Sequence, residues 1–169
     1  MLVELNLLNH HIEFMQNYLF CVGLTETFKE LTKGYKPVKH LDLLFESLCS
    51  ATNFEAEKIK VISKKSLEEF KDKSSSNISS LLKEKKVSNA YSSRILNLGI
   101  YIIISNSSDF ENKKESEKSE LIEAIFKSLE LSLSKAEKDI GIYKSSIIKL
   151  NQAKELLEEL KIKDKKKVK

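Results

Sequence analysis

The sequence predicts an all-α protein, built as a single-domain helical bundle with a long C-terminal helix. Three observations predict this class. Apolar residues recur at helical spacing along almost the whole chain of 169 residues. Glycine and proline, which interrupt helices, number only four and one. A content of 41% apolar and 32% charged residues fits one domain with one core.

Two apolar stripes predict the first two helices. One stripe runs from Leu2 to Ile12. The other lies within residues 18–34 and ends at Gly34, in the position of a C-terminal cap, with Pro37 shortly beyond it. The second helix is therefore expected to end at Gly34.

Two further helices are expected at residues 39–51 and 54–72, from the same periodicity. In the later one, Ser66 is followed three residues on by Glu69, the spacing of a capping box. This pattern leaves open a restart of the helix at Ser66.

Two polar segments, 72–88 and 105–118, are interpreted as surface connections, the first with a short helix around Leu81. Between them, residues 91–104 end in Ile-Tyr-Ile-Ile-Ile, a β-branched run that also fits a strand. We expect a helix, because one apolar run without a partner of similar character makes no sheet.

The clearest element begins at Ser134, which forms an S-x-x-E capping box with Glu137. Apolar residues then follow at spacings of three and four, with Lys154 as the one polar break, namely Ile140, Tyr143, Ile147, Leu150 and Leu157. The chain is thus expected to consist of a helical body, 1–133, and a long amphipathic, coiled-coil-like helix, 134–169. This helix could pack on the body or project, and in the second case Tyr143, Ile147, Leu150 and Leu157 are the expected partner contacts.

Gly23 and Gly99 each stand inside an apolar helical run, where glycine costs about 1 kcal/mol relative to alanine. Two helices can approach closely where neither carries a side chain. We expect both glycines at helix crossings in the core, with a kink beside a ligand as the alternative.

The net charge of +4 is concentrated in residues 161–169, which hold six lysines and one aspartate. The lysines are Lys161, Lys163, Lys165, Lys166, Lys167 and Lys169. They could meet an anionic membrane surface or form a solvated terminus. Nucleic-acid binding is not expected, because Arg94 is the only arginine and no aromatic residue follows Tyr143.

No constellation of residues predicts catalysis or a metal centre. His10 and Glu13 have H-x-x-E spacing, but no second motif supplies the three or four ligands that a metal needs. The glycines are too scattered for a phosphate-binding loop, and no serine lies in G-x-S-x-G. Cys21 and Cys49 have apolar neighbours and are expected to be reduced and buried. We therefore expect no enzyme and no cofactor, with pigment binding by the histidines left open.

Membrane spans and signal peptides are not predicted either. The longest apolar run, 95–104, has about half of the ~20 residues that a spanning helix needs. Glu4 interrupts the apolar stretch that a signal peptide would require. We expect a cytosolic or peripheral protein.

Five segments, in order and spacing, resemble the thylakoid formation protein family of cyanobacteria and plastids. They are VELNLLNHHIEF, YLFCVGLTETFKELTKGYKP, LFESLCSA, YSSRILNLGIYIII and DIGIYKSSIIKLNQAKELLEEL, and together they extend from about residue 2 to residue 160. The matching positions include Phe14, Phe20, Gly23, Phe28, Gly34, Tyr35, Pro37, Phe45, Cys49, Tyr91 and Gly99. Where relatives tend to have Tyr-Asp, this chain has Gln16 and Asn17, and Asn17 is itself a good N-cap.

The resemblance implies an all-helical, non-enzymatic accessory protein of photosystem II biogenesis and repair. It implies peripheral association with the thylakoid membrane and a link to FtsH-type membrane proteases, which we expect to be bound on the cytoplasmic side. The absence of a transit peptide favours a cyanobacterial over a plastid protein. The alternative is a helical module that binds anionic membranes through the lysine-rich C-terminus.

Overall fold

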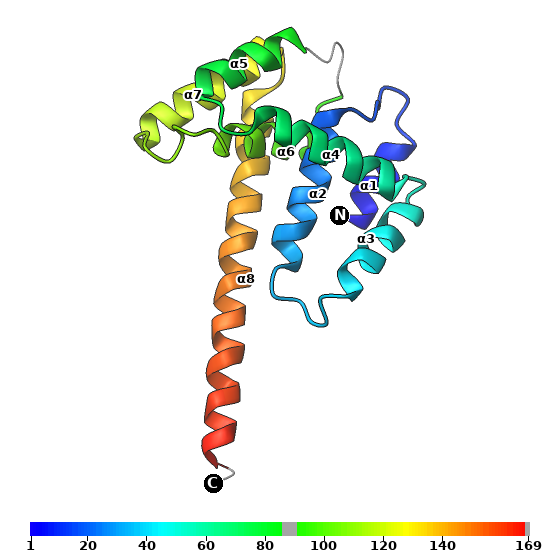
Figure 1. Cartoon of the computed structure of the whole chain (residues 1–169), viewed down its shortest axis with the longest axis vertical. Coiled ribbons are helices and arrows are strands. Elements are labelled where there is room, and N and C mark those ends of the chain that lie inside the picture. The colour runs from blue at the N-terminus through cyan, green and yellow to red at the C-terminus, as the bar shows by residue number, and fades with distance from the viewer. Residues whose placement is uncertain (86–90, 168–169) are drawn as a thin grey trace.

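The computed structural model describes the backbone of residues 1–85 and 91–167, and the side chains of residues 1–85 and 91–160. Within these ranges, all the regular secondary structure is α-helical. The helices are α1 (Leu2–Asn9), α2 (Tyr18–Thr32), α3 (His40–Ser50), α4 (Ala56–Phe70), α5 (Ser75–Glu84), α6 (Arg94–Ser105), α7 (Glu115–Ser128) and α8 (Leu133–Lys167). Figure 1 shows α1 to α7 packed into a body from which α8 projects as a stalk. The predicted all-α class and long C-terminal helix are confirmed.

Helix α2 lies at the centre of the body and divides the core into two clusters. One cluster joins Leu19 and Val22 of α2 to residues from α4 to α8. The other joins Phe20 and Leu24 to α1, α3, α4 and the first turn of α6. Residues 19–25 are therefore buried on every side of the helix. The most extensive packing in the body is that of α2 against α6.

Gly23 and Gly99 lie where α2 crosses α6, as the sequence predicts. A Cβ atom added to Gly23 would come within 1.9 Å of the carbonyl oxygen of Ile95 and 2.9 Å of the backbone nitrogen of Gly99. A Cβ atom added to Gly99 would come within 1.9 Å of the carbonyl oxygen of Leu19. The two backbones therefore touch, and this contact excludes any side chain at either position.

The first helix is shorter than its apolar stripe predicts. Helix α1 ends at Asn9, and the ring nitrogen Nδ1 of His10 lies 2.9 Å from the carbonyl oxygen of Asn6. The imidazole thus bonds to a carbonyl group of the last turn, where the end of a helix leaves carbonyl groups without amide partners. Ile12 consequently lies outside α1 and is fully exposed, and Leu2 is exposed as well.

Two of the predicted helix starts are also corrected. Helix α4 continues through Ser66, whose hydroxyl donates to the carbonyl oxygen of Ile62 at 2.9 Å instead of capping a new helix. Helix α8 begins at Leu133, and the hydroxyl of Ser132 accepts from the amide of Lys135 at 3.4 Å. Ser134 therefore lies within the first turn and is not the cap.

The remaining helix boundaries agree more closely with the sequence. Asn17 caps α2 by accepting from the amide of Phe20 at 3.0 Å. Helix α2 ends at Thr32, and Gly34 follows with a φ of +84°, which glycine adopts without strain. The β-branched run lies in α6, so the preference for a helix there is confirmed.

Polar side chains anchor α5 within the segment 72–88. Asp109, in the connection before α7, accepts from the amide and the hydroxyl of Ser75, both at 2.7 Å. These bonds and the Lys113 ammonium hold the pKa of Asp109 well below its usual range, with the Ser75 hydroxyl as the largest cause. A charged carboxylate thus accepts a hydrogen bond from a free backbone amide in the first turn of α5 and interacts favourably with the helix dipole.

Candidate interaction site

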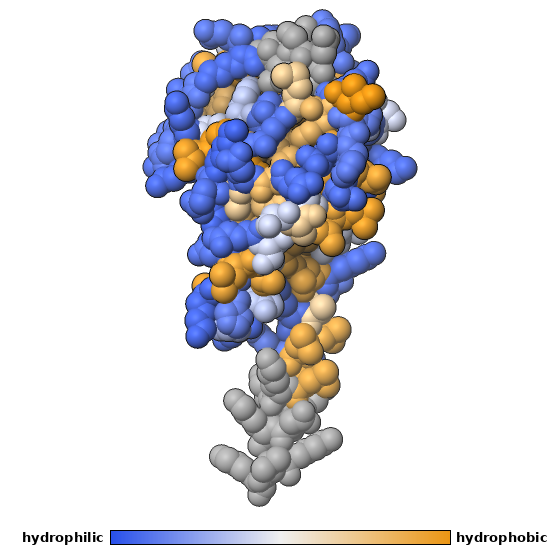
Figure 2. Space-filling model, turned by 90° about the vertical axis from the view of Figure 1, so that its right-hand side faces the viewer, coloured by the Kyte–Doolittle hydropathy of each residue, from blue (hydrophilic) through white to orange (hydrophobic). Residues whose placement is uncertain are grey.

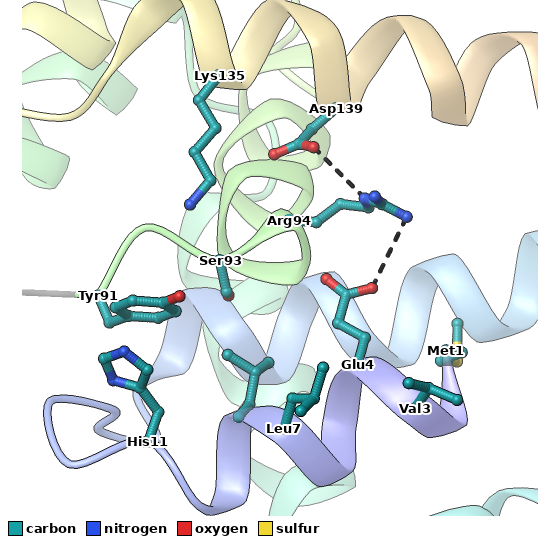
Figure 3. A pocket seen from close by; sticks show the side chains of 11 residues that line it. Met1, Val3, Glu4, Leu7, His11, Tyr91, Ser93, Arg94, Lys135 and Asp139 are labelled. Atoms are coloured by element: carbon teal, nitrogen blue, oxygen red, sulfur yellow. Dashed lines mark hydrogen bonds and ion pairs between the residues drawn. The ribbon is translucent and has the colours of Figure 1, made fainter.

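A cavity of about 660 Å³ opens between α1 and α8, beside the first turn of α6 (Figure 3). Val3 and Leu7 of α1 form an apolar wall. Arg94 lies between α1 and α8, and Tyr91 lies at one end of the cavity. Since these residues come from segments far apart in the sequence, only the folded chain forms this cavity.

Arg94 joins three helices. Its Nε atom donates to Oδ1 of Asp139 in α8 at 3.4 Å, and its Nη1 atom lies 3.9 Å from Oε2 of Glu4 in α1. Arg94 takes this position because α6 starts here, where Ser93 caps the helix. Both ion pairs are longer than the 2.7–2.9 Å typical of strong charge-assisted bonds. They orient α1 and α8 on α6 more than they stabilise the fold.

Asp139 is the buried member of this network. Its side chain is 8% exposed, and its carboxylate accepts a second bond from Nδ2 of Asn97 at 2.9 Å. The amide oxygen of Asn97 in turn accepts from the Ser92 hydroxyl at 3.3 Å. A buried carboxylate needs such donors, because desolvation disfavours its charged form. For Glu4, burial raises the pKa and the nearby Arg94 guanidinium opposes this rise.

Ring and cation contacts border the end of the cavity at Tyr91. The rings of His11 and Tyr91 lie 3.9 Å apart between centroids, and Nζ of Lys135 lies 5.3 Å from the centroid of Tyr91. Lys135 also donates to the carbonyl oxygen of Ser92. The first turn of α8 is thereby tied to the segment that precedes α6.

The chemistry of this arrangement is that of a structural junction. Its charged groups bond to one another or to the backbone, which positions three helices. No group of three metal-binding side chains occurs among the residues that the structure describes. Cys21 and Cys49 are free and buried, and burial raises the pKa of each thiol to about 11. Neither cysteine is therefore an activated nucleophile.

The structure brings together several positions that the family resemblance singled out. Phe14, Phe20, Phe28, Phe45, Cys49 and Tyr91 all belong to, or pack against, the core cluster around α1 to α4. Ring centroids lie 5.0 Å apart for Phe14 and Phe20, and 5.1 Å apart for Phe28 and Phe45. Gly34, Tyr35 and Pro37 are not members of this cluster and are exposed in the connection from α2 to α3, although Gly34 and Tyr35 line one cavity with Phe28 and Phe45.

The stripe predicted to bind a partner divides into two parts. Tyr143, Ile147 and Leu150 are half-buried. Tyr143 lines a small pocket together with Thr27 and Leu31 of α2. Burial, and next the carboxylate of Glu30, raise the pKa of Tyr143 to about 12. Leu157, by contrast, is 56% exposed.

Leu156 and Leu160 extend this exposed part and were missed by sequence reasoning. They are 60% and 56% exposed. Their spacing of four residues places them on one face of α8, which is the signal that could have identified them. Figure 2 shows the corresponding apolar atoms on the projecting part of α8. The lysines predicted to meet a membrane, from Lys161 to Lys169, lie outside the residues whose side chains are described.

Comparison with known proteins places the chain in a family. The family model described as thylakoid formation protein matches residues 1–169. The chain belongs to the thylakoid formation protein family. The resemblance inferred from the sequence is therefore confirmed.

Two relatives named Thf1 are similar to this chain along most of its length. The protein Thf1 of Prochlorococcus marinus strain MIT 9312 is 70% identical over 166 residues, which cover 98% of this chain and 83% of that protein. Thf1 of Prochlorococcus marinus subspecies pastoris is 69% identical over 166 residues, covering 98% of this chain and 82% of that protein.

A solved structure of Psb29 has a similar fold. Its TM-score is 0.85 at 24% sequence identity, over 98% of this chain and 84% of that chain. In the part of the chain that the structure describes, no helix is both long and apolar enough to cross a membrane.

Proposed function

We propose that this chain is a non-enzymatic accessory factor of photosystem II biogenesis and repair, which binds an FtsH-type protease on the cytoplasmic side of the thylakoid membrane. Membership in the thylakoid formation protein family supports the setting. One observation supports the binding role. The projecting part of α8 exposes Leu156, Leu157 and Leu160 beyond the packed body.

These leucines suit a groove on a partner. Burying a leucine side chain contributes about 1.5–3 kcal/mol, and leucines within one helical turn can enter the same apolar groove. The first part of α8 is fixed to the body through Ala136 and Ile140, which are buried. The projecting part is therefore presented in a defined direction, and less conformational entropy is lost when it binds.

Binding of this kind would stabilise an assembled protease without any chemical step. A ligand that binds only the assembled state stabilises it by about 2.7 kcal/mol at a hundredfold excess over its Kd. The accessory factor thereby raises the amount of active protease.

The test is a pull-down from solubilised thylakoid membranes with the tagged full-length protein, in low and high salt. Retained proteins are identified by mass. We expect FtsH subunits to remain bound in high salt, because apolar contacts persist when the Debye length falls to about 3 Å at 1 M. Replacement of Leu156, Leu157 and Leu160 by serine should abolish this retention.

A matched variant controls for loss of apolar surface on α8. Ile148→Ser removes an apolar side chain that is 57% exposed but lies closer to the body. It should retain the protease. Equal retention by the triple variant and the wild type would show that the projecting leucines are not the docking element. Failure of the wild type to retain FtsH would remove the protease from the proposal.

Peripheral attachment to an anionic membrane is a second candidate function. The six lysines among residues 161–169 favour it, since each contributes about 1 kcal/mol near a charged bilayer. We expect sedimentation with anionic vesicles that decreases as salt is added. Equal sedimentation with neutral and anionic vesicles would exclude this function.

A further inference from the structure

A second cavity, unrelated to the junction at Arg94, lies between α2 and α3. Its volume is about 450 Å³, within the range of small-molecule sites. Phe28 and Phe45 form its floor with ring centroids 5.1 Å apart, and Leu41 and Val38 extend the apolar lining. We call this cavity the α2–α3 groove.

The rim of the α2–α3 groove is basic. Four lysines and one carboxylate line it, namely Lys29, Lys33, Lys36, Lys60 and Asp42. Three of the lysines are paired. Lys60 pairs with Asp42, Glu46 and Glu57 at 3.2, 3.6 and 3.2 Å, so it is not counted as a ligand contact. On the surface, Lys29 pairs with Glu26 at 2.5 Å and Lys33 with Glu30 at 3.6 Å. Such exposed pairs are weak, so an anionic ligand can replace them. Within the described residues, Lys36 has no ion pair.

The segment that borders the groove alternates lysine with apolar residues. Residues 33–39 read Lys-Gly-Tyr-Lys-Pro-Val-Lys, and the next carboxylate is that of Asp42. Tyr35 is 43% exposed and Val38 is 69% exposed. Exposed tyrosine and lysine side chains on one turn are typical of a segment that lies at a membrane interface.

The position of this segment allows contact with a flat surface. It forms the turn between α2 and α3 at one end of the body (Figure 1). In Figure 2, apolar residues are exposed both at the lower end of the body and on the projecting part of α8, on the same side of the molecule. A bilayer could therefore meet both at once.

We propose that the α2–α3 groove binds an anionic membrane lipid. The acyl chain lies on Phe28 and Phe45, and Lys33 and Lys36 hold the anionic headgroup. Tyr35 and Val38 enter the interface beside it. A lipid fits better than an acidic helical peptide, because the apolar lining is short, whereas a helix needs an extended seam of contacts at i, i+3, i+4 and i+7.

The chain contains no tryptophan, so a single introduced tryptophan reports on one place only. The test uses full-length Val38→Trp with vesicles of phosphatidylcholine alone or mixed with phosphatidylglycerol. We expect the emission of the introduced indole to shift to shorter wavelength with the anionic vesicles only. The lysines of 161–169 could attach the protein to the same vesicles, but they would not by themselves bury position 38.

A second tryptophan position provides the control for general adsorption. Val61 of α4 is 63% exposed, close to the value for Val38, and does not line the groove. Val61→Trp should show no shift. Equal shifts at both positions would overturn the proposal in favour of unspecific adsorption.

Charge reversal tests the headgroup contact. In the Val38→Trp background, Lys33→Glu with Lys36→Glu should reduce partitioning into anionic vesicles at least tenfold. The reason is that each lysine contributes appreciably to the electrostatic attraction to an anionic bilayer. Lys64→Glu with Lys65→Glu changes the net charge equally at two exposed lysines of α4 and should have a smaller effect. Equal effects of the two pairs would overturn the proposal.

Three further outcomes also overturn it. Sedimentation without a shift at position 38 would assign attachment to the C-terminal lysines. A shift caused equally by inorganic phosphate would indicate a site for free anions. A shift with polyglutamate but not with vesicles would assign the groove to an acidic protein segment.

Discussion

The crossing of α2 and α6 and the projecting part of α8 are both rich in apolar residues. These residues are buried at the crossing and exposed on α8. At the crossing, Gly23 and Gly99 let two backbones touch and every neighbouring side chain is buried. On α8, Leu156, Leu157 and Leu160 remain exposed. The comparison shows that apolar content does not determine burial. An apolar side chain becomes buried only where another element of the chain can pack closely against it.

The same comparison separates stability from binding. Residues at the crossing contribute to the free energy of unfolding, because they are packed in the monomer. The leucines on α8 add little to it and are available for association. Substitutions in the two regions should therefore have effects of very different size.

The largest effect is expected for Gly99→Ala. The new Cβ atom would lie 1.9 Å from the carbonyl oxygen of Leu19, so α2 and α6 must separate. We expect a loss of more than about 4 kcal/mol in the free energy of unfolding, measured by urea denaturation. Gly141→Ala is the control, because nothing lies within 4 Å of the added atom, and it should gain up to about 1 kcal/mol. Similar effects of both substitutions would contradict the close crossing.

An intermediate effect is expected for Asp139→Asn, which tests how firmly the first part of α8 is held. The substitution keeps the size of the side chain but weakens its bonds to Arg94 and Asn97. We expect a loss of about 1–2 kcal/mol in thermal or urea unfolding, mainly from the buried bond to Asn97, because the half-exposed Arg94 contributes little. Glu137→Gln, an exposed position on the same helix, should change stability by less than about 0.5 kcal/mol. An unchanged stability of Asp139→Asn would mean that the network does not hold α8.

The smallest effect is expected for Leu157→Ala. Because this leucine is exposed, its truncation should change the free energy of unfolding by less than about 0.5 kcal/mol. The same kind of truncation at Ile100, which is fully buried in α6, should cost about 2–5 kcal/mol. A large loss with Leu157→Ala would show that the end of α8 packs on the body in solution.

The sequence predicted the crossing because a glycine inside an apolar helix weakens that helix unless another backbone packs against it. Gly23 and Gly99 each show this signal in their own segment, and the structure shows that the two segments cross at these glycines. The start of α8 was predicted less well. Ser132 and Ser134 are both good caps, and the S-x-x-E spacing favoured Ser134, whereas the chain enters the helix at Ser132.

The junction at Arg94 could not be predicted, because its partners are far apart in the sequence. Glu4, Arg94 and Asp139 each look like surface charges when considered alone. A signal did exist at Asp139, which lies on the inward face of α8 between Ala136 and Ile140. Periodicity likewise predicted the stripe on α8 but not which of its residues the body covers, since that depends on where α2 ends.

The most extensive contact in the body also has a consequence for synthesis. Helix α2 is buried on all sides over residues 19–25, and α6, which covers one of these sides, follows about 70 residues later. At translation rates of ~5–20 residues per second, several seconds pass before α6 has been made. Throughout that interval α1, α3 and α4 can cover only one side of α2, and the side that packs against α6 stays exposed and prone to aggregation.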